Sequence, residues 1–461
     1  MSTVLELLPG IFFVLLFLGG IRLMSSPRTA QMGNLLGAIG VLSAVLYTLF
    51  AAGIVDMTGI LIPVGIGAVI GYFLAVRVSM IQMPQLVALL NGLGGGASAA
   101  TALAALGSGV ASVFTASLAL LVGGVTLGGS LLAAAKLARL LPQKPTMLRY
   151  HSFINVAMMV CLGVLIAGMV FWGQSAMLAS AVVLLAVSIA FGVVFTVRIG
   201  GADMPITISL LNSLSGLAGS VAGIAIGEPI LVGTGAIVGS AGLILTQVMC
   251  RAMNRSLQDI LLGRTSVSTQ SSPSNISAEV ISTEVTEAGE HNNPLEKLTD
   301  AKTVFFVPGY GMALSQAQHR VKEFGDLLER QGKDVKFAIH PVAGRMPGHM
   351  YVLLAEAGVP YEKLLEIDSA NPLLADTDVV IVVGANDVVN PSATSAEGTP
   401  IYGMPILNVS DARHIIIFNM DTNPGYAGVD NPLYVSKKAT LMTGDASERI
   451  GEFMTKYTEK S

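Results

Sequence analysis

The chain divides into two parts by its pattern of apolar and polar residues. As far as about residue 250, long apolar stretches follow one another with only short polar gaps. A helix needs roughly 20 apolar residues to cross the ~30 Å hydrocarbon core of a bilayer. Nine stretches meet this length and predict nine transmembrane helices. They span residues 4–24, 33–53, 57–76, 84–106, 111–135, 152–173, 176–197, 204–226 and 229–250.

The few charges of this part agree with nine helices. If the helices alternate in direction, every loop Lys and Arg falls on one side of the membrane, and the other side receives only acidic residues. The positive-inside rule makes the first side cytoplasmic, which places the N-terminus outside and the C-terminal part in the cytoplasm. The first stretch contains Glu6 and lacks a basic leader, so we expect a retained helix and not a signal peptide.

Composition supports a membrane protein and excludes some other classes. The chain is 52% hydrophobic and 12% charged, against about 25% charged residues in soluble domains. A net charge of -4 gives no sign of nucleic-acid binding. The two cysteines, Cys161 and Cys250, lie in apolar runs, so neither a disulfide framework nor a metal site is expected.

An internal repeat lies within the membrane part. Residues 77–98 align with residues 198–220 at an offset of 121, which pairs Asn91 with Asn212. Four predicted helices separate the copies, so both run in the same direction, a construction common in transporters. Each Asn is expected near mid-membrane, either in a hydrogen bond that fixes helix packing or on a proton or ion path. No titratable side chain is expected at this depth, so a complete proton relay requires another polypeptide.

The second part has the pattern of an α/β domain. Residues 256–297 are polar without periodicity and predict a mobile linker between a membrane domain, 1–255, and a domain at 298–461. Short apolar runs that end in glycine or polar residues predict buried parallel strands, and residues 311–332 predict an amphipathic helix. The alternation indicates a Rossmann-like doubly wound sheet with its ligand at the carboxyl ends of the strands. The predicted strands are 303–309, 335–341, 379–387 and 414–421.

Glycine-rich turns follow these strands and indicate a nucleotide site. In the first turn, Gly309 is expected to permit a tight turn and Gly311 to let the backbone approach a pyrophosphate. Alone this signal is weak, but several such turns at one sheet edge make a nucleotide site much more probable. The second strand ends in His340-Pro341, where NAD-binding domains carry an acidic residue for the ribose. The other turns are 342–349, 383–387 and 423–432.

The order of motifs resembles a known family. PGYGMA, HPVAGRMPGHM, GAND, GMP and GYAGVDNPL, in this order after nine helices, are similar to the β subunit of proton-translocating NAD(P) transhydrogenase. The resemblance implies a bacterial inner-membrane protein of the Re/Si-specific type. This chain would hold NADP(H), and an α subunit would hold NAD(H) and supply further membrane helices. Hydride transfer between the two would be coupled to proton movement, in a dimer of αβ units.

The resemblance also assigns roles to residues. Asp387 would sense protonation and gate nucleotide release, although a turn-capping Asp is the alternative. Asn91, Ser130 and Asn212 would lie on the proton path, and Asp203 at an interface. Some members of the family carry His where this chain has Asn91, and others have Asn there and take the path histidine from the membrane helices of the α subunit. The Asn of this chain implies the second arrangement. The cofactor-binding residues implied are Gly309, Tyr310, Gly311, Val342, Ala343, Gly344, Arg345, Met346, Pro347, Gly348, Gly384, Ala385, Asn386, Asp387, Val388, Asn419, Met420, Asp421, Gly425, Tyr426, Ala427, Asp445 and Ala446.

One departure from the family bears on the cofactor. The family carries Lys-Arg-Ser after the fourth predicted strand to bind the 2′-phosphate, and this chain has Asn419-Met420-Asp421. Losing two cations weakens phosphate binding, and Asp421 could accept bonds from a 2′-hydroxyl and favour NAD(H). NADP(H) remains the expected ligand, with Arg345 and Arg413 as substitute cations. The alternatives are a nucleotide-gated transporter and a variant whose nucleotide specificity is switched or lost.

Overall fold

The structure is a computed structural model. It describes residues 2–24, 29–51, 57–78, 82–107, 109, 112–142, 146, 150–171, 177–200, 203–253, 256–257, 293–346 and 348–460. The predicted linker, 256–297, therefore lies almost entirely outside the described residues. Its last four positions are helical, because α11 (Pro294–Asp300) begins there, with the side chain of Asn293 accepting a bond from the Leu295 N–H at 3.1 Å.

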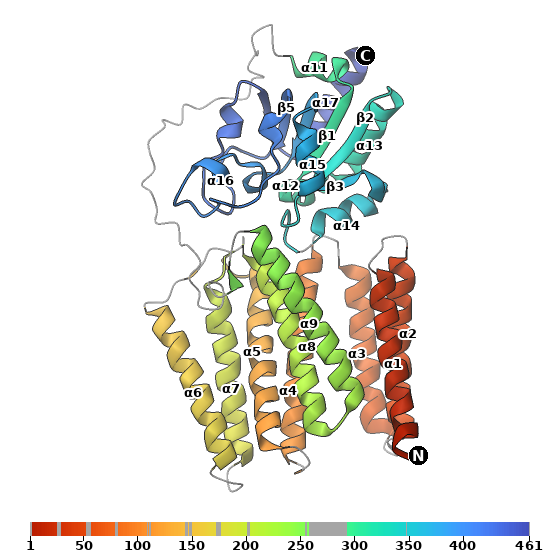
Figure 1. The fold of residues 1–461 in the computed structure, drawn as a ribbon, viewed down its shortest axis with the longest axis vertical. Coiled ribbons are helices and arrows are strands. Elements are labelled where there is room, and N and C mark those ends of the chain that lie inside the picture. The colour runs from red at the N-terminus through yellow and green to blue at the C-terminus, as the bar shows by residue number, and fades with distance from the viewer. Residues whose placement is uncertain are drawn as a thin grey trace. The chain divides into compact units, whose positions relative to one another are not determined.

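Helices are the regular elements of the membrane part within these ranges (Figure 1). Each of the nine predicted stretches forms one helix, and most ends fall within three residues of the prediction. Eight of the described helices are long and apolar enough to cross a membrane, and α1 has a shorter described apolar stretch, Leu8–Met24. The helices are α1 (Ser2–Met24), α2 (Ala30–Ala51), α3 (Met57–Arg77), α4 (Met83–Gly107), α5 (Val113–Leu137), α6 (His151–Phe171), α7 (Met177–Val197), α8 (Met204–Ile226) and α9 (Pro229–Ala252).

Glycines bring the helices of this part into backbone contact. A Cβ atom placed on Gly128 of α5 would lie 2.2 Å from the Ile189 carbonyl oxygen of α7. On α7, a Cβ on Gly192 would lie 2.2 Å from the Val125 oxygen of α5. Any larger residue would push these two helices apart. Small residues serve this purpose in membranes because lipid offers no hydrophobic drive for helices to associate.

The two copies of the repeat pack against each other at equivalent positions. A Cβ on Gly94 of α4 would lie 3.9 Å from the Ser215 Cβ of α8, and one on Gly219 would lie 3.9 Å from the Ser98 Oγ. Both pairs are separated by 121 residues, the offset of the repeat. The contact between α4 and α8 is therefore approximately symmetric, and the repeat explains why both helices are rich in glycine and serine.

Lys136 caps the C-terminal end of the neighbouring helix α7. It is fully buried near the end of α5, and its ammonium group donates to the carbonyl oxygens of Val197 and, at 2.9 Å, Ile199. The last carbonyls of a helix have no partner within the helix, and they carry partial negative charge. A buried cation at the end of α7 satisfies both needs, so Lys136 acts in packing.

The C-terminal domain is built on one parallel sheet of six strands in the order β3-β2-β1-β4-β5-β6. The four predicted strands form within two residues of their predicted starts. Two further strands, β3 and β6, are short edge strands that the sequence pattern did not reveal. The parallel order confirms the doubly wound architecture and brings all carboxyl strand ends to one edge. The strands are β1 (Thr303–Pro308), β2 (Asp334–Ile339), β3 (Leu364–Glu366), β4 (Val379–Val383), β5 (His414–Asn419) and β6 (Ala439–Thr443).

Helices cover this sheet and differ from the prediction at one place. The predicted helix 311–332 is broken after its first turn, because Gln316 takes a left-handed backbone conformation with φ of 52°. The core on this side joins rings from three elements: Phe306 stacks on Phe337 at 5.3 Å between ring centroids and meets Phe324 edge-on at 5.6 Å. The main helices are α12 (Tyr310–Leu314), α13 (Gln318–Arg330), α14 (His349–Glu356), α15 (Ile367–Leu374), α16 (Ser392–Ser395) and α17 (Ala446–Lys460).

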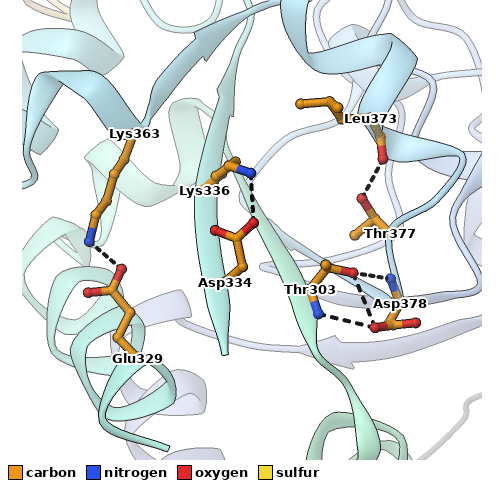
Figure 2. Close-up of polar contacts among 8 residues, drawn as sticks. All are labelled: Thr303, Glu329, Asp334, Lys336, Lys363, Leu373, Thr377 and Asp378. Carbon is orange, nitrogen blue, oxygen red and sulfur yellow. Dashed lines mark hydrogen bonds and ion pairs between the residues drawn. The ribbon is translucent and has the colours of Figure 1, made fainter. Parts of the chain in front are cut away.

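The amino edge of the sheet is fixed by Asp378 (Figure 2). Its carboxylate accepts the N–H groups of Lys302 and Thr303 at 2.9 and 3.1 Å, and Arg413 pairs with it at 2.8 Å. Burial opposes ionisation, but these donors together hold the pKa of Asp378 below its usual value. Arg413 precedes β5 and therefore lies at the edge opposite the candidate ligand site. The expectation that Arg413 substitutes for the missing phosphate cations is wrong.

Candidate functional site

The turns after β1 and β4 interlock at the carboxyl edge of the sheet. The Gly309 N–H donates to the Val383 oxygen, and the Gly311 N–H donates to the Gly384 oxygen, both at 2.8 Å. A Cβ on Gly309 would lie 2.3 Å from the Gly384 oxygen, and one on Gly384 would lie 2.3 Å from the Gly311 Cα. Gly309 has φ of −127°, so its turn does not need glycine for conformation. The glycines are needed because two backbones touch.

His340 anchors the loop after β2. Its Nδ1 accepts the Val342 N–H at 3.2 Å, which leaves the proton on Nε2, where it is donated to the Pro405 oxygen at 2.8 Å. Burial lowers the pKa of His340 to about 4, and the bond to Pro405 only partly opposes this. The side chain that replaces the usual ribose-binding acid is thus a neutral structural group facing inward.

The described residues of the loop that follows, 342–346 and 348, curve tightly around His349. Gly344 and Gly348 have φ of 106° and 71°, and the His349 Nδ1 accepts the Arg345 N–H at 3.2 Å. Burial, and then the positive charge of Arg345, lower the pKa of His349 to about 4, so the ring is neutral. Of the other predicted residues here, Ala343 is buried, Val342 and Met346 are half-buried, and Pro347 lies outside the described residues.

Arg345 joins three of the predicted segments. Its side chain is only 5% exposed, and its guanidinium carbon lies 4.5 Å from the ring centroid of Tyr310 and 5.6 Å from that of Tyr426. It also donates to the Tyr426 hydroxyl. A guanidinium packed against two aromatic rings is held in place, and its planar fork matches the oxygens of phosphate. The structure therefore brings together the loops after β1, β2 and β5 around one positive charge.

Asp387 lies beneath the segment 425–427. Its Oδ2 accepts the Ala427 N–H at 3.1 Å, and a Cβ on Gly425 would lie 2.5 Å from its Oδ1. This Oδ1 is buried with no hydrogen-bond partner among the described residues. Burial raises the pKa of Asp387 and outweighs the N–H groups of Ala427 and Tyr426, which act in the opposite direction. The bonds of this carboxyl group thus reach a different loop and do not cap its own turn.

Asparagine side chains connect the turn after β4 to the loop 423–431. Asn386 donates to the Asn423 oxygen at 3.0 Å, Asn431 donates to the Asn386 Oδ1 at 3.1 Å, and Asn390 donates to the Asp430 oxygen at 3.2 Å. Sequence reasoning named only Asn386 of these. The repeated Asn in GAND, VVNP and VDNP was the available signal. On the same turn, Ala385 and Val388 pack into the hydrophobic core beneath the site.

The turns after β5 and β6 adjoin one another, because the Gly444 N–H donates to the Asn419 oxygen at 2.9 Å. Asn419 donates to the Tyr434 hydroxyl at 2.7 Å, Met420 is 62% exposed, and Asp421 accepts the Asn423 N–H at 2.9 Å. Asp445 bonds the N–H groups of Ser447 and Glu448 at 2.9 and 3.2 Å, ahead of the buried Ala446 that begins α17. The predicted residue Asp445 is thus the N-terminal cap of this helix.

Arg449 is a cation at this edge that sequence reasoning missed. Its Nε donates to the Thr443 oxygen at 2.8 Å, at the carboxyl end of β6, and its Nη1 pairs with Glu452. The side chain is 38% exposed, so it remains accessible to a ligand. The sequence offered no signal for it, because Arg449 lies four residues after Asp445, inside an amphipathic helix.

The membrane part holds the remaining predicted residues. Asn91 and Ser130 are buried, and the Asn91 Nδ2 and the Ser130 Oγ have no hydrogen-bond partner among the described residues. They lie on touching helices, because a Cβ on Gly92 would be 3.1 Å from the Ser130 Cβ. Asn212 is half-buried on α8, and Asp203 is buried just before that helix.

These features define a class: a polytopic membrane protein with a doubly wound domain whose loops converge on a candidate dinucleotide site. Comparison with known proteins identifies the family. The model of the NAD(P) transhydrogenase beta subunit matches residues 8–456. NAD(P) transhydrogenase subunit beta of Rhodospirillum rubrum is 38% identical over 448 residues, covering 94% of this chain and 95% of that protein. A protein of the same name from a designated strain of that species matches equally. The chain belongs to the NAD(P) transhydrogenase beta subunit family.

Proposed function

We propose that this chain holds NADP(H) on its sheet domain and exchanges hydride with NAD(H) held by an α subunit, in the Re/Si-specific manner, coupled to proton movement across the membrane. Membership of the family supports an oxidoreductase role. The nicotinamide supplies the redox chemistry, and the protein orients it. We place the complex, as a dimer of αβ units, in a bacterial inner membrane, with the N-terminus outside and the sheet domain in the cytoplasm.

The residues at the carboxyl edge suit a dinucleotide. Arg345 offers a fixed positive charge for the phosphates, and the positive φ of Gly344 and Gly348 turns a short loop around it. Tyr310 and Tyr426 offer aromatic rings beside that charge, at 6.1 Å between their centroids. The segment 425–427 is in position to cover the ligand, because it already bonds to Asp387.

Asp387 carries the proposal of proton coupling. A buried carboxyl group with a raised pKa is neutral more readily than an exposed one, so a proton stabilises its present surroundings. Those surroundings include the segment 425–427. Proton uptake would therefore favour the closed position of that segment, and proton release would favour its opening. This links nucleotide binding to protonation without any titratable group at mid-membrane.

The complex isolated through an affinity tag on this chain tests the function. In proteoliposomes we expect NADPH to reduce the 3-acetylpyridine analogue of NAD⁺ and a pH gradient to form as it does so. Collapsing the gradient with an uncoupler should change the rate of hydride transfer. Proton movement that responds to nucleotide without any hydride transfer would favour the nucleotide-gated transporter. Hydride transfer without a gradient would contradict coupling.

Arg449 is the cation we propose for the 2′-phosphate. It remains at the carboxyl edge, beside the turns after β5 and β6, whereas Arg413 lies at the amino edge. Charge-assisted bonds contribute about 1.5–3 kcal/mol, so Arg449→Met should weaken NADPH binding by roughly ten- to a hundredfold and leave NADH binding unchanged.

Calorimetric titration of the full-length chain with each nucleotide measures this preference. Arg413→Met is the matched control, and it should alter neither affinity. If the unmodified chain (the parent) binds NADH as tightly as NADPH, the assignment of NADP(H) is wrong. Asp421 then becomes the candidate partner of a 2′-hydroxyl. If Arg449→Met weakens both nucleotides equally, Arg449 does not contact the 2′-phosphate.

A further inference from the structure

Most buried hydroxyl groups of the described membrane helices donate to a backbone carbonyl oxygen, either of their own helix or, as for Ser209 and Ser213 on α8, of a neighbouring helix. Two exceptions lie on α5 and α7. The Thr126 hydroxyl on α5 donates to the Val122 oxygen one turn earlier, at 2.7 Å. The Ser188 hydroxyl on α7 does the same with the Leu184 oxygen at 2.7 Å. Such bonds to the same helix are the usual way to satisfy a hydroxyl in lipid. The hydroxyls of Ser130 and Thr196 have no such bond, although both residues are fully buried.

Thr196 directs its hydroxyl toward α5. A Cβ placed on Gly129 would lie 2.9 Å from the Thr196 Oγ1, so the hydroxyl touches the α5 backbone next to Ser130. On the other side of α5, Gly92 contacts Ser130 and is preceded by Asn91. Figure 1 shows α5 flanked by α4 and α7, and α5 packs against both.

Three buried polar atoms without partners among the described residues thus follow one another from helix to helix. They are the Nδ2 of Asn91, the Oγ of Ser130 and the Oγ1 of Thr196. Buried polar groups in proteins are nearly always hydrogen-bonded, to protein or to ordered water. No neighbouring side chain in the part of the chain that the structure describes satisfies these three atoms. A shared chain of water molecules would satisfy them together.

We propose that Thr196 is a further residue of the proton path and extends it from Ser130 to the end of α7. Thr196 is the second-last residue of α7, whereas Ser130 lies about two turns inside α5. A hydroxyl both donates and accepts, so it can sustain a proton-carrying water chain without changing its own charge. The proton enters and leaves through water, and Thr196 keeps its own. The proposal rests on the proposed proton coupling and adds a residue that family resemblance did not supply.

Cysteine accessibility tests the hydration of this position independently of coupling. The background is the full-length chain in native membranes with Cys161→Ser and Cys250→Ser. In it, Thr196→Cys should react with a membrane-impermeant methanethiosulfonate at least roughly tenfold faster than Thr126→Cys, because only water-exposed thiolates react. Equal rates at the two positions would overturn the proposal.

Proton coupling provides the second measurement, in the complex isolated through this chain. Thr196→Val keeps the shape and removes the hydroxyl, and should lower the proton-transfer rate by roughly a hundredfold. Thr196→Ser should restore it, and Thr126→Val, which removes a hydroxyl already bonded to its own helix, should match the parent. Parent-like coupling in Thr196→Val refutes the path role. Loss in both Thr196→Val and Thr196→Ser would show a packing role and equally refute it. If the unmodified complex itself shows no coupling of hydride transfer to proton movement, the proposed function is refuted instead.

Discussion

Asp387→Asn should abolish the pH dependence of nucleotide release and slow turnover by roughly a hundredfold. Asn is neutral at every pH, so it imitates the protonated carboxyl beneath the segment 425–427. In the parent, the pKa of Asp387 is raised above the ordinary 3.8, chiefly by burial. As the pH rises through that raised pKa, the carboxyl ionises and loses the stability of its buried position. Release should therefore accelerate with pH in the parent, by up to about tenfold per pH unit, and stay constant in the variant.

Stopped-flow displacement of NADPH at a series of pH values measures both rates. Asp411→Asn is a suitable control, because Asp411 is exposed before β5 and should leave the pH profile of release unchanged. A second measurement distinguishes a loss of proton coupling from a loss of folding in the variant. Since the variant cannot bury a charge, its domain should be more stable than the parent at high pH. A variant with the parental slope of release against pH would contradict the role of Asp387.

Gly384→Ala should be the most damaging of the single glycine substitutions in the sheet domain. The residue has φ of 63°, and a Cβ there would lie 2.3 Å from the Gly311 Cα and 2.4 Å from the Met312 nitrogen. Both atoms belong to the backbone, so no side-chain rotation relieves the clash. We expect a loss of about 3 kcal/mol in the free energy of unfolding.

Gly332→Ala separates crowding from backbone strain in this measurement. Gly332 also has a left-handed backbone, with φ of 82°, but a Cβ there would meet nothing within 4 Å. It should therefore cost only about 1 kcal/mol. Scanning calorimetry of the full-length chain, with and without nucleotide, gives both values. Equal losses in the two variants would show that the contact between the turns after β1 and β4 contributes nothing to stability.

Apolar length and period explain why so much of the fold could be predicted. The membrane helices are long uniform runs, and the central strands, such as Val379–Val383, are continuous and fully buried. The edge strands were missed because burial does not mark them: Leu364–Glu366 has three residues, and Ala439–Thr443 is only partly covered. The break at Gln316 was missed because a single left-handed residue leaves the amphipathic pattern intact.

The candidate site was predictable as a set of turns but not as a set of contacts. Glycine-rich segments after strands predicted that these turns meet at one edge of the sheet, because parallel strands bring their ends together. The sequence could not show what Arg413 contacts, although its position before the predicted strand 414–421 already places it at the amino edge, opposite the expected ligand site. Nor could it distinguish Thr196 from Thr126, because both are threonines in apolar helices, and only the neighbouring helix leaves one of them without a partner.

The backbone contact between the turns after β1 and β4 has a thermodynamic consequence. Tyr310 lies between the two interlocked glycines of the first turn, and Asp387 follows Gly384 by three residues. Backbone atoms of the two turns are in direct contact, so we expect a displacement of one turn to displace the other. A ligand that displaces Tyr310 must therefore change the surroundings of the Asp387 carboxyl. By reciprocity, whatever a proton on Asp387 does to nucleotide affinity, the nucleotide does to the affinity of Asp387 for the proton. Under the proposed function, a few atoms of main chain would then be sufficient to exchange free energy between a redox cofactor and a proton.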